Sequence, residues 1–190
     1  MSHGPLIRIT AETAAEVCAC FNLQREAKNL LRDRMNPHEF ASALIENKMG
    51  ADAIEFMAHA LPAREGIWWG CLCMHHALGE NLSRPDLAAA TAAVQWVMRP
   101  TEENRSAARA PADAAPPPSV AGALATAAYH TGGSIAPPGL PFKPPEPFAP
   151  AKAIALAVKL ASVKAEPTKI PKMQKSYVEL AMEVAAGHLI

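Results

Sequence analysis

Apolar residues recur at helical spacing along most of this chain. Ile54, Met57, Ala58 and Leu61 follow the i, i+3, i+4, i+7 rule of an amphipathic helix. The stretch 63–78 is apolar on more than one face, which is typical of a helix at the centre of a core. Alternating apolar and polar positions, the pattern of a half-buried strand, do not occur. The pattern therefore predicts an all-α protein.

Residues that start or stop helices set the expected boundaries. Asn36, Pro37 and Glu39 supply a cap, a first helical proline and a capping-box glutamate for a helix that ends near Met49 and Gly50. Further helix starts are expected at Thr10, Ser83, Thr101 and Ser119. Amphipathic patterns predict helices over 23–34, 151–163 and 171–188. Short loops between neighbours predict a compact array of about eight short antiparallel helices.

The predicted core centres on the helix that carries Trp68 and Trp69. Adjacent residues on a helix point in different directions, so one ring faces the core. The other lies under a neighbouring helix or at a contact surface, and Trp69 is our candidate partner contact. The residues expected to be buried with one of these rings are Ile54, Met57, Leu72, Leu87 and Val94.

Proline is concentrated in the second half of the chain. Eleven of the eighteen Pro residues lie between Pro111 and Pro150. The composition of 132–150 favours polyproline II and turns over helix. We therefore predict a helical body over 1–131 and a long Pro/Gly-rich connecting strap over 132–150. The last two helices, over 151–190, are expected to form a pair that packs on the body as one domain.

Two aromatic residues lie among the prolines of this strap. Phe142 and Phe148 are six residues apart, so in a polyproline II segment with about three residues per turn they project from one side. We predict that the strap lies extended over the helical body and contributes to partner binding. In the favoured interpretation both rings pin the loop to its own domain, and in the alternative they contact a partner directly.

Cys71 and His75 form the densest candidate for metal chemistry. They are four residues apart, so on a helix they share a face and could supply two ligands to Zn²⁺. Cys18 or Cys20 could complete the set, although Cys-x-Cys lacks the usual Cys-x-x-Cys spacing. Because free cysteine is among the most buried residue types, we predict no cofactor and keep the metal pair as the alternative.

The formal net charge of zero bears on which classes of partner the chain can bind. Lys and Arg number 18 and Asp and Glu also number 18, which excludes a general electrostatic attraction to nucleic acid or an anionic membrane. No apolar run approaches the ~18 residues that span a bilayer, and no signal-peptide pattern opens the sequence, so we expect a cytoplasmic protein. No motif combines a nucleophile, a general base and an oxyanion hole, which predicts a protein that is not an enzyme.

Three segments carry a resemblance to a known family. They are the Trp-Trp helix of 63–73, the Pro-Thr-Glu-Glu-Asn-Arg start of 100–105, and Gly-Gly-Ser followed by Pro-Pro-Gly over 132–139. In these features the chain resembles an uncharacterised bacterial family of small Ala-rich helical proteins associated with type VI secretion gene clusters. The resemblance covers roughly residues 55–150. It implies an accessory role beside a secreted effector or spike component and supplies no catalytic residues.

The leading functional hypothesis is a protein-binding adaptor or chaperone of such a secretion system. A long Pro-rich segment is costly to order unless it docks on its own domain or on a partner. The alternatives are a small helical metal- or ligand-binding module built around Cys71 and His75, and an immunity protein that neutralises a toxin. Stoichiometric zinc that survives dialysis would favour the module, and its absence would leave the adaptor ahead.

Overall fold

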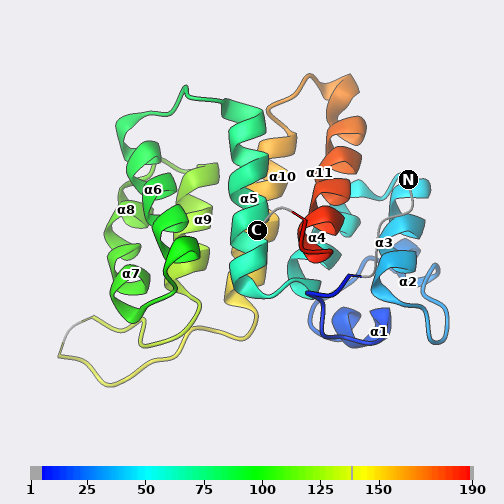
Figure 1. Ribbon diagram of the computed structural model, residues 1–190, viewed down its shortest axis with the longest axis horizontal. Coiled ribbons are helices and arrows are strands. Elements are labelled where there is room, and N and C mark those ends of the chain that lie inside the picture. Colours follow the sequence, from blue (N-terminus) through cyan, green and yellow to red (C-terminus); the bar gives the residue numbers. More distant parts are fainter. Residues whose placement is uncertain (1–5, 138, 189–190) are drawn as a thin grey trace.

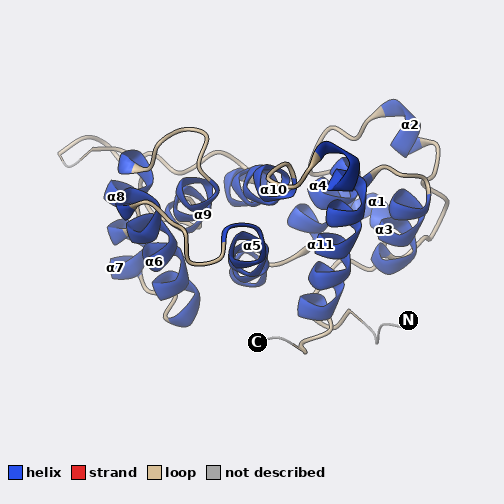
Figure 2. Ribbon diagram, turned by 90° about the horizontal axis from the view of Figure 1, so that it is seen from above, coloured by secondary structure: helices blue, strands red, loops and turns tan. Residues whose placement is uncertain are grey.

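The computed structural model describes residues 6–137 and 139–188, and these residues form helices and loops with no strand. The all-α prediction is confirmed. The helices form an elongated array in which α5 and α10 lie between two groups (Figures 1 and 2). In chain order the helices are α1 (Ala14–Cys18), α2 (Arg25–Lys28), α3 (Pro37–Glu46), α4 (Gly50–Ala60), α5 (Ala63–Leu78), α6 (Arg84–Met98), α7 (Glu102–Ala107), α8 (Arg109–Ala114), α9 (Val120–Tyr129), α10 (Ala149–Ser162) and α11 (Ile170–Ala185).

Most of the predicted helix starts are present. Asn36 and Glu39 form the full capping box at the start of α3, each side chain accepting from the backbone N–H of the other. Ser83, Thr101 and Ser119 likewise accept a backbone N–H in the first turn of α6, α7 and α9. These bonds satisfy donors that a helix N-terminus leaves without an intrahelical partner. Local hydrogen bonding therefore determines where these helices begin.

Three boundaries differ from the expectation. Thr13, not Thr10, caps α1, because its hydroxyl accepts from the Glu16 N–H. Most of 23–34 is not helical: α2 is one short turn, and the rest of this amphipathic segment forms turns and loop. Gly50 begins α4 and does not end α3: the chain turns before it, where Lys48 has a φ of +61°. Gly50 instead allows a close approach of α11, since a Cβ there would lie 2.5 Å from Gln174 Oε1.

The C-terminal helices are built into the centre of the molecule. α10 packs against α9, α5 and α4, and α11 covers α4 and α5. α6 and α8 lie on the far side of α9, while α3 and α1 lie beyond α4 (Figure 2). Buried side chains from α1 to α11 form one hydrophobic cluster. The helices of 151–188 therefore belong to the same core as the helices before the strap.

Trp69 lies at the centre of this core. Its side chain is fully buried with Ile54 and Met57, and its indole Nε1 donates to the Tyr177 carbonyl oxygen at 2.8 Å. Trp68 is half-buried at the edge of the cluster. The assignment of Trp69 as a partner contact is therefore wrong, because a side chain with 0% exposure reaches no partner of the folded chain.

α6 buries a different face from the one expected. Leu87, which was expected in the core, is 56% exposed, and Met98 near the end of α6 is 67% exposed. Val94 and Leu72 on α5, also expected in the core, are only half-buried. The buried positions of α6 are Ala89, Ala90, Ala92, Ala93, Trp96 and Val97. Small side chains allow α6 to approach α9, which is itself rich in buried alanine. α6 therefore packs on α9 through its alanine face, and not through the larger side chains of Leu87 and Val94 that were expected in the core.

Candidate functional site

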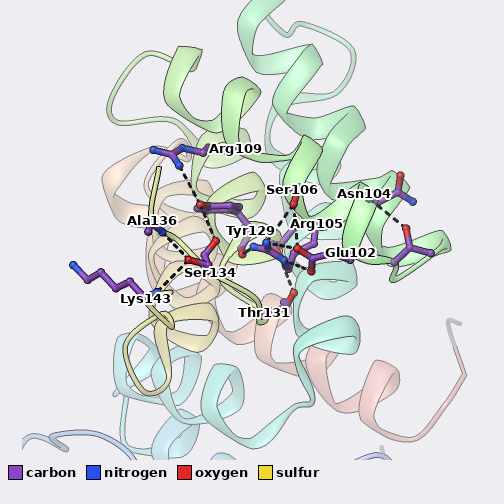
Figure 3. Close-up of polar contacts among 12 residues, drawn as sticks. Glu102, Asn104, Arg105, Ser106, Arg109, Tyr129, Thr131, Ser134, Ala136 and Lys143 are labelled. Atoms are coloured by element: carbon purple, nitrogen blue, oxygen red, sulfur yellow. Dashed lines mark hydrogen bonds and ion pairs between the residues drawn. The ribbon is translucent and has the colours of Figure 1, made fainter. Parts of the chain in front are cut away.

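Two of the three segments singled out in the sequence meet where α7, α9 and the strap come together (Figure 3). Arg105 of α7 is the centre of this site and is 5% exposed. It is the last residue of the Pro-Thr-Glu-Glu-Asn-Arg motif and lies beside the end of α9, which leads into Gly-Gly-Ser. The arrangement brings the two motifs into direct contact through one side chain.

Arg105 uses its whole guanidinium group. Nε and Nη2 donate to the two carboxylate oxygens of Glu102 at 2.7 and 2.6 Å, and Nη1 donates to the Tyr129 carbonyl oxygen at 2.6 Å. The bonds from Arg105 lower the pKa of Glu102, and the same bonds raise the pKa of Arg105. A bidentate pair of this kind holds one geometry, which a lysine could not reproduce. The last turn of α9 is thereby tied to α7.

Tyr129 joins this pair to the strap. The guanidinium carbons of Arg105 and Arg109 lie 5.0 and 5.6 Å from the centroid of its ring. The Tyr129 hydroxyl accepts from Arg109 Nη1 at 3.3 Å and donates to the Ser134 carbonyl oxygen at 3.4 Å. Two cations therefore lie over the Tyr129 ring, and cations favour the face of an aromatic ring.

Ser134 closes the strap into a loop. Its hydroxyl oxygen accepts from the N–H groups of Ala136 and Lys143 at 3.2 and 3.1 Å, and the Ile135 N–H donates to the Lys143 carbonyl oxygen at 2.8 Å. Gly133 has a φ of +64°, and a Cβ there would lie 2.5 Å from Arg105 Nη2. Glycine is thus required where the loop passes the buried arginine. We call this network, made of Glu102, Arg105, Tyr129, Gly133 and Ser134, the arginine clamp.

The strap does not lie over the helical body as predicted. Beyond the clamp it projects past the ends of α7 and α9 (Figure 1). Leu140 and Phe142 are 62% and 72% exposed. The loop is closed by hydrogen bonds within itself, between Ser134, Ile135 and Lys143, and so it needs no helix surface beneath it. We call residues 139–142, between the clamp and Lys143, the loop tip.

Phe148 has a different role from Phe142. It is the residue before α10, with a φ of +59°, and its ring centroid lies 6.0 Å from that of His59 on α4. His59 in turn stacks on Phe21 at 4.6 Å. Phe148 is still 46% exposed, so the contact covers about half of it. Phe148 thus pins the end of the strap to its own domain, as the favoured interpretation expected, whereas Phe142 does not.

Comparison with known proteins adds one finding. Residues 40–185 match DUF6931, a family of unknown function. The chain belongs to this family. No curated protein and no solved structure matches it. The matched range of the DUF6931 chain runs from α3 to α11 and includes the whole arginine clamp and the strap. An uncharacterised family was expected, and the match confirms that part of the expectation.

The two residues of the alternative metal site in the DUF6931 chain, Cys71 and His75, lie in different environments. Cys71 is 5% exposed and burial raises its pKa to about 12, while His75 is exposed. A thiol of that pKa stays protonated at neutral pH, and the thiolate is the form that binds zinc. Among the residues that the structure describes, no group of three or more Cys, His, Asp or Glu side chains is placed to hold a metal. Nothing in the geometry therefore favours the module.

Sequence reasoning missed the role of Arg105 in this DUF6931 chain. The available signal was the pair of opposite charges at Glu102 and Arg105, three residues apart and hence neighbours on a helix. Its partner Tyr129 is 24 residues further along, and no local pattern connects the two. No helix of the described part of the chain is long and apolar enough to cross a membrane.

His59 makes the stability of the DUF6931 chain depend on pH. Its Nδ1 donates to the Glu55 carbonyl oxygen, its side chain is fully buried, and Nε2 has no hydrogen-bond partner among the described residues. Burial lowers its pKa, with Lys152 and Lys159 acting in the same direction and Glu55 opposing them. Below pH 6.5, the ordinary histidine pKa, the unfolded chain therefore binds more protons than the folded one. The free energy of unfolding consequently decreases as the pH is lowered.

We expect the melting temperature to drop less between about pH 7.5 and pH 5 in His59→Gln than in the wild type. Glutamine keeps a donor for the Glu55 carbonyl oxygen but does not titrate. Part of the drop should remain, because burial also lowers the pKa of His130. His75→Gln, at an exposed position, is the matched control and should keep the wild-type drop. An equal drop in wild type and His59→Gln would contradict the assignment.

Proposed function

We propose that this chain is a non-enzymatic protein-binding accessory protein and that the loop tip is its partner-binding element. The observation that carries the proposal is the combination of a fixed base and an exposed apolar end. Leu140 and Phe142 are the most exposed large apolar side chains in the described part of the strap, yet the loop that bears them is closed at Ser134 and Lys143. Exposed apolar groups on a positioned loop are typical of contact sites.

Proline and the clamp lower the entropic cost of such a contact. Pro137 lies shortly before the tip and Pro141 lies within it, and each ring fixes its own φ near −65°. The loop therefore has less conformational freedom to lose on binding than an ordinary loop of the same length. Phe142 then supplies the kind of aromatic side chain that dominates binding energy at interfaces.

The type of partner follows from the resemblance given above. That resemblance supports a cytoplasmic adaptor or chaperone for an effector or spike component of a bacterial type VI secretion system. The net charge of +0 supports a protein partner over nucleic acid or a membrane surface. An immunity protein would use the same kind of exposed loop, and the identity of the captured protein separates the two.

The test is capture by the double variant Leu140→Ser/Phe142→Ser. Immobilised wild-type chain should retain a protein from the source organism's lysate in a near-stoichiometric amount, and the double variant should retain less than about a tenth of it. The melting temperatures should be equal, because both side chains already face solvent. Leu156→Ser/Val163→Ser is the matched control and should bind like the wild type; Leu156 on α10 is 52% exposed and Val163, just after α10, is 54% exposed.

Two results would count against the proposal. If the double variant retains the captured protein as well as the wild type does, the loop tip is not the contact. If the double variant melts at a clearly lower temperature, Leu140 and Phe142 pack on their own domain and the strap has a structural role only.

A further inference from the structure

Prolines set the backbone conformation of 141–147, the part of the strap that leads to α10. Four of these seven residues are proline, and each ring fixes its own φ near −65°. Lys143, Pro144 and Glu146 each precede a proline, which directs their backbone to extended conformations. The structure has no helix or turn over 141–146, in agreement with these constraints. The segment is therefore preorganised for polyproline II, the extended helix without internal hydrogen bonds.

The order of residues in this segment gives it two apolar faces. Polyproline II has about three residues per turn, so residues three apart share a face. One face consists of three exposed prolines, which we call the proline ridge: Pro141, Pro144 and Pro147. The second face carries Phe142 and Pro145, and the third carries Lys143 and Glu146. Two adjacent apolar faces with the charges on the third are suited to a ligand that lies in a groove.

The backbone of the segment offers hydrogen-bond acceptors but few donors. Proline has no N–H, and the N–H of Lys143 already donates to Ser134 Oγ at 3.1 Å. Alternate residues of a strand face one edge, and prolines interrupt the donors along both edges, so the segment cannot pair with a strand over its length. Three carbonyl oxygens accept no hydrogen bond within the described part of the chain, those of Pro141, Phe142 and Pro144. They are left for a partner that donates.

We infer that the proline ridge is a polyproline II ligand for a protein domain whose shallow groove is lined by Trp and Tyr side chains. The inference rests on the proposed function and names the kind of partner that the same loop binds. Aromatic rings pack against proline rings, and indole N–H and tyrosine O–H groups donate to the carbonyl oxygens of such a ligand. The strap projects past the ends of α7 and α9, so a domain can approach it (Figure 1).

The test starts from the protein that the immobilised full chain captures. That protein is identified by mass spectrometry, purified and titrated calorimetrically with the wild-type chain and with Pro141→Ala/Pro144→Ala. The double variant removes two rings of the ridge and their constraint on φ, and it should bind at least ~10-fold more weakly. Both prolines are exposed, so the melting temperature should change little. Pro100→Ala/Pro116→Ala, at exposed positions outside the strap, is the matched control and should bind like the wild type.

A competitor tests the kind of groove directly. A proline decapeptide forms polyproline II and carries no other feature of this chain. At millimolar concentration it should displace the captured protein from the immobilised wild-type chain, because it occupies the same aromatic groove. A glycine–serine peptide of equal length is flexible and lacks proline rings, so it should displace none. Glu146→Gln, on the charged third face, should leave the affinity unchanged.

The outcomes separate this inference from the proposed function. Wild-type affinity in Pro141→Ala/Pro144→Ala, or no displacement by the proline decapeptide, overturns the polyproline II mode. If Leu140→Ser/Phe142→Ser nevertheless loses the captured protein, the loop tip remains the contact and only the kind of partner is wrong. If the wild-type chain captures no protein, or if every variant retains it equally, the proposed function fails and this inference fails with it.

Discussion

Truncating Trp69 to Ala is expected to lower the free energy of unfolding by about 3–5 kcal/mol. The indole has 0% exposure at the contact of α5 with α11, so its removal leaves a cavity in the middle of the core. The Tyr177 carbonyl oxygen also loses the donor that now lies 2.8 Å away. Denaturant titration followed by circular dichroism measures the change.

Trp68→Ala is the matched control for this experiment. Trp68 is half-buried at the edge of the same cluster, so its loss should cost clearly less than that of Trp69. If both substitutions leave the midpoint of unfolding unchanged, α5 is not the central helix. If Trp68→Ala costs more than Trp69→Ala, the orientation of the helix is wrong.

Replacing Arg105 by Ala should lower the free energy of unfolding by about 2–3 kcal/mol. The change removes a buried charged side chain that is 5% exposed and leaves the Tyr129 carbonyl oxygen without its donor. Glu102 keeps its hydration, since its side chain is 68% exposed, and this limits the loss. The strap should also open at its base, because Gly133 and Tyr129 lose the guanidinium group against which they pack.

Amide hydrogen exchange distinguishes the clamp from general destabilisation. In Arg105→Ala the amides of Ile135 and Lys143 should exchange faster by a larger factor than amides of α4 and α5. Arg105→Lys keeps the positive charge but not the planar guanidinium group that makes the bidentate pair, and it should show most of this increase in exchange rate. Arg109→Ala, at 40% side-chain exposure, should change little. Uniformly faster exchange across the chain would contradict a local role for Arg105.

Much of the secondary structure was predictable from short segments of the sequence. The capping box at Asn36 and the starts at Ser83 and Ser119 all lie where the pattern indicated. The central position of α5 followed from its apolar residues on several faces. The Trp-Trp helix was also correctly expected to direct one ring into the core, although the pattern did not tell which one.

The sequence alone thus determined most helices and their starts. A cap is a hydrogen bond between residues three apart, and an amphipathic stripe is a periodicity within one segment, so both can be identified without knowing the neighbouring helices. The tertiary structure decided which stripe of α6 is buried, since the Ala-rich face of α9 allows an approach that larger side chains would prevent. It also decided the clamp, whose Arg105 and Tyr129 are 24 residues apart and meet only when α7 packs on α9. Contacts of this kind depend on the shape and distance of a neighbour, which no single segment encodes.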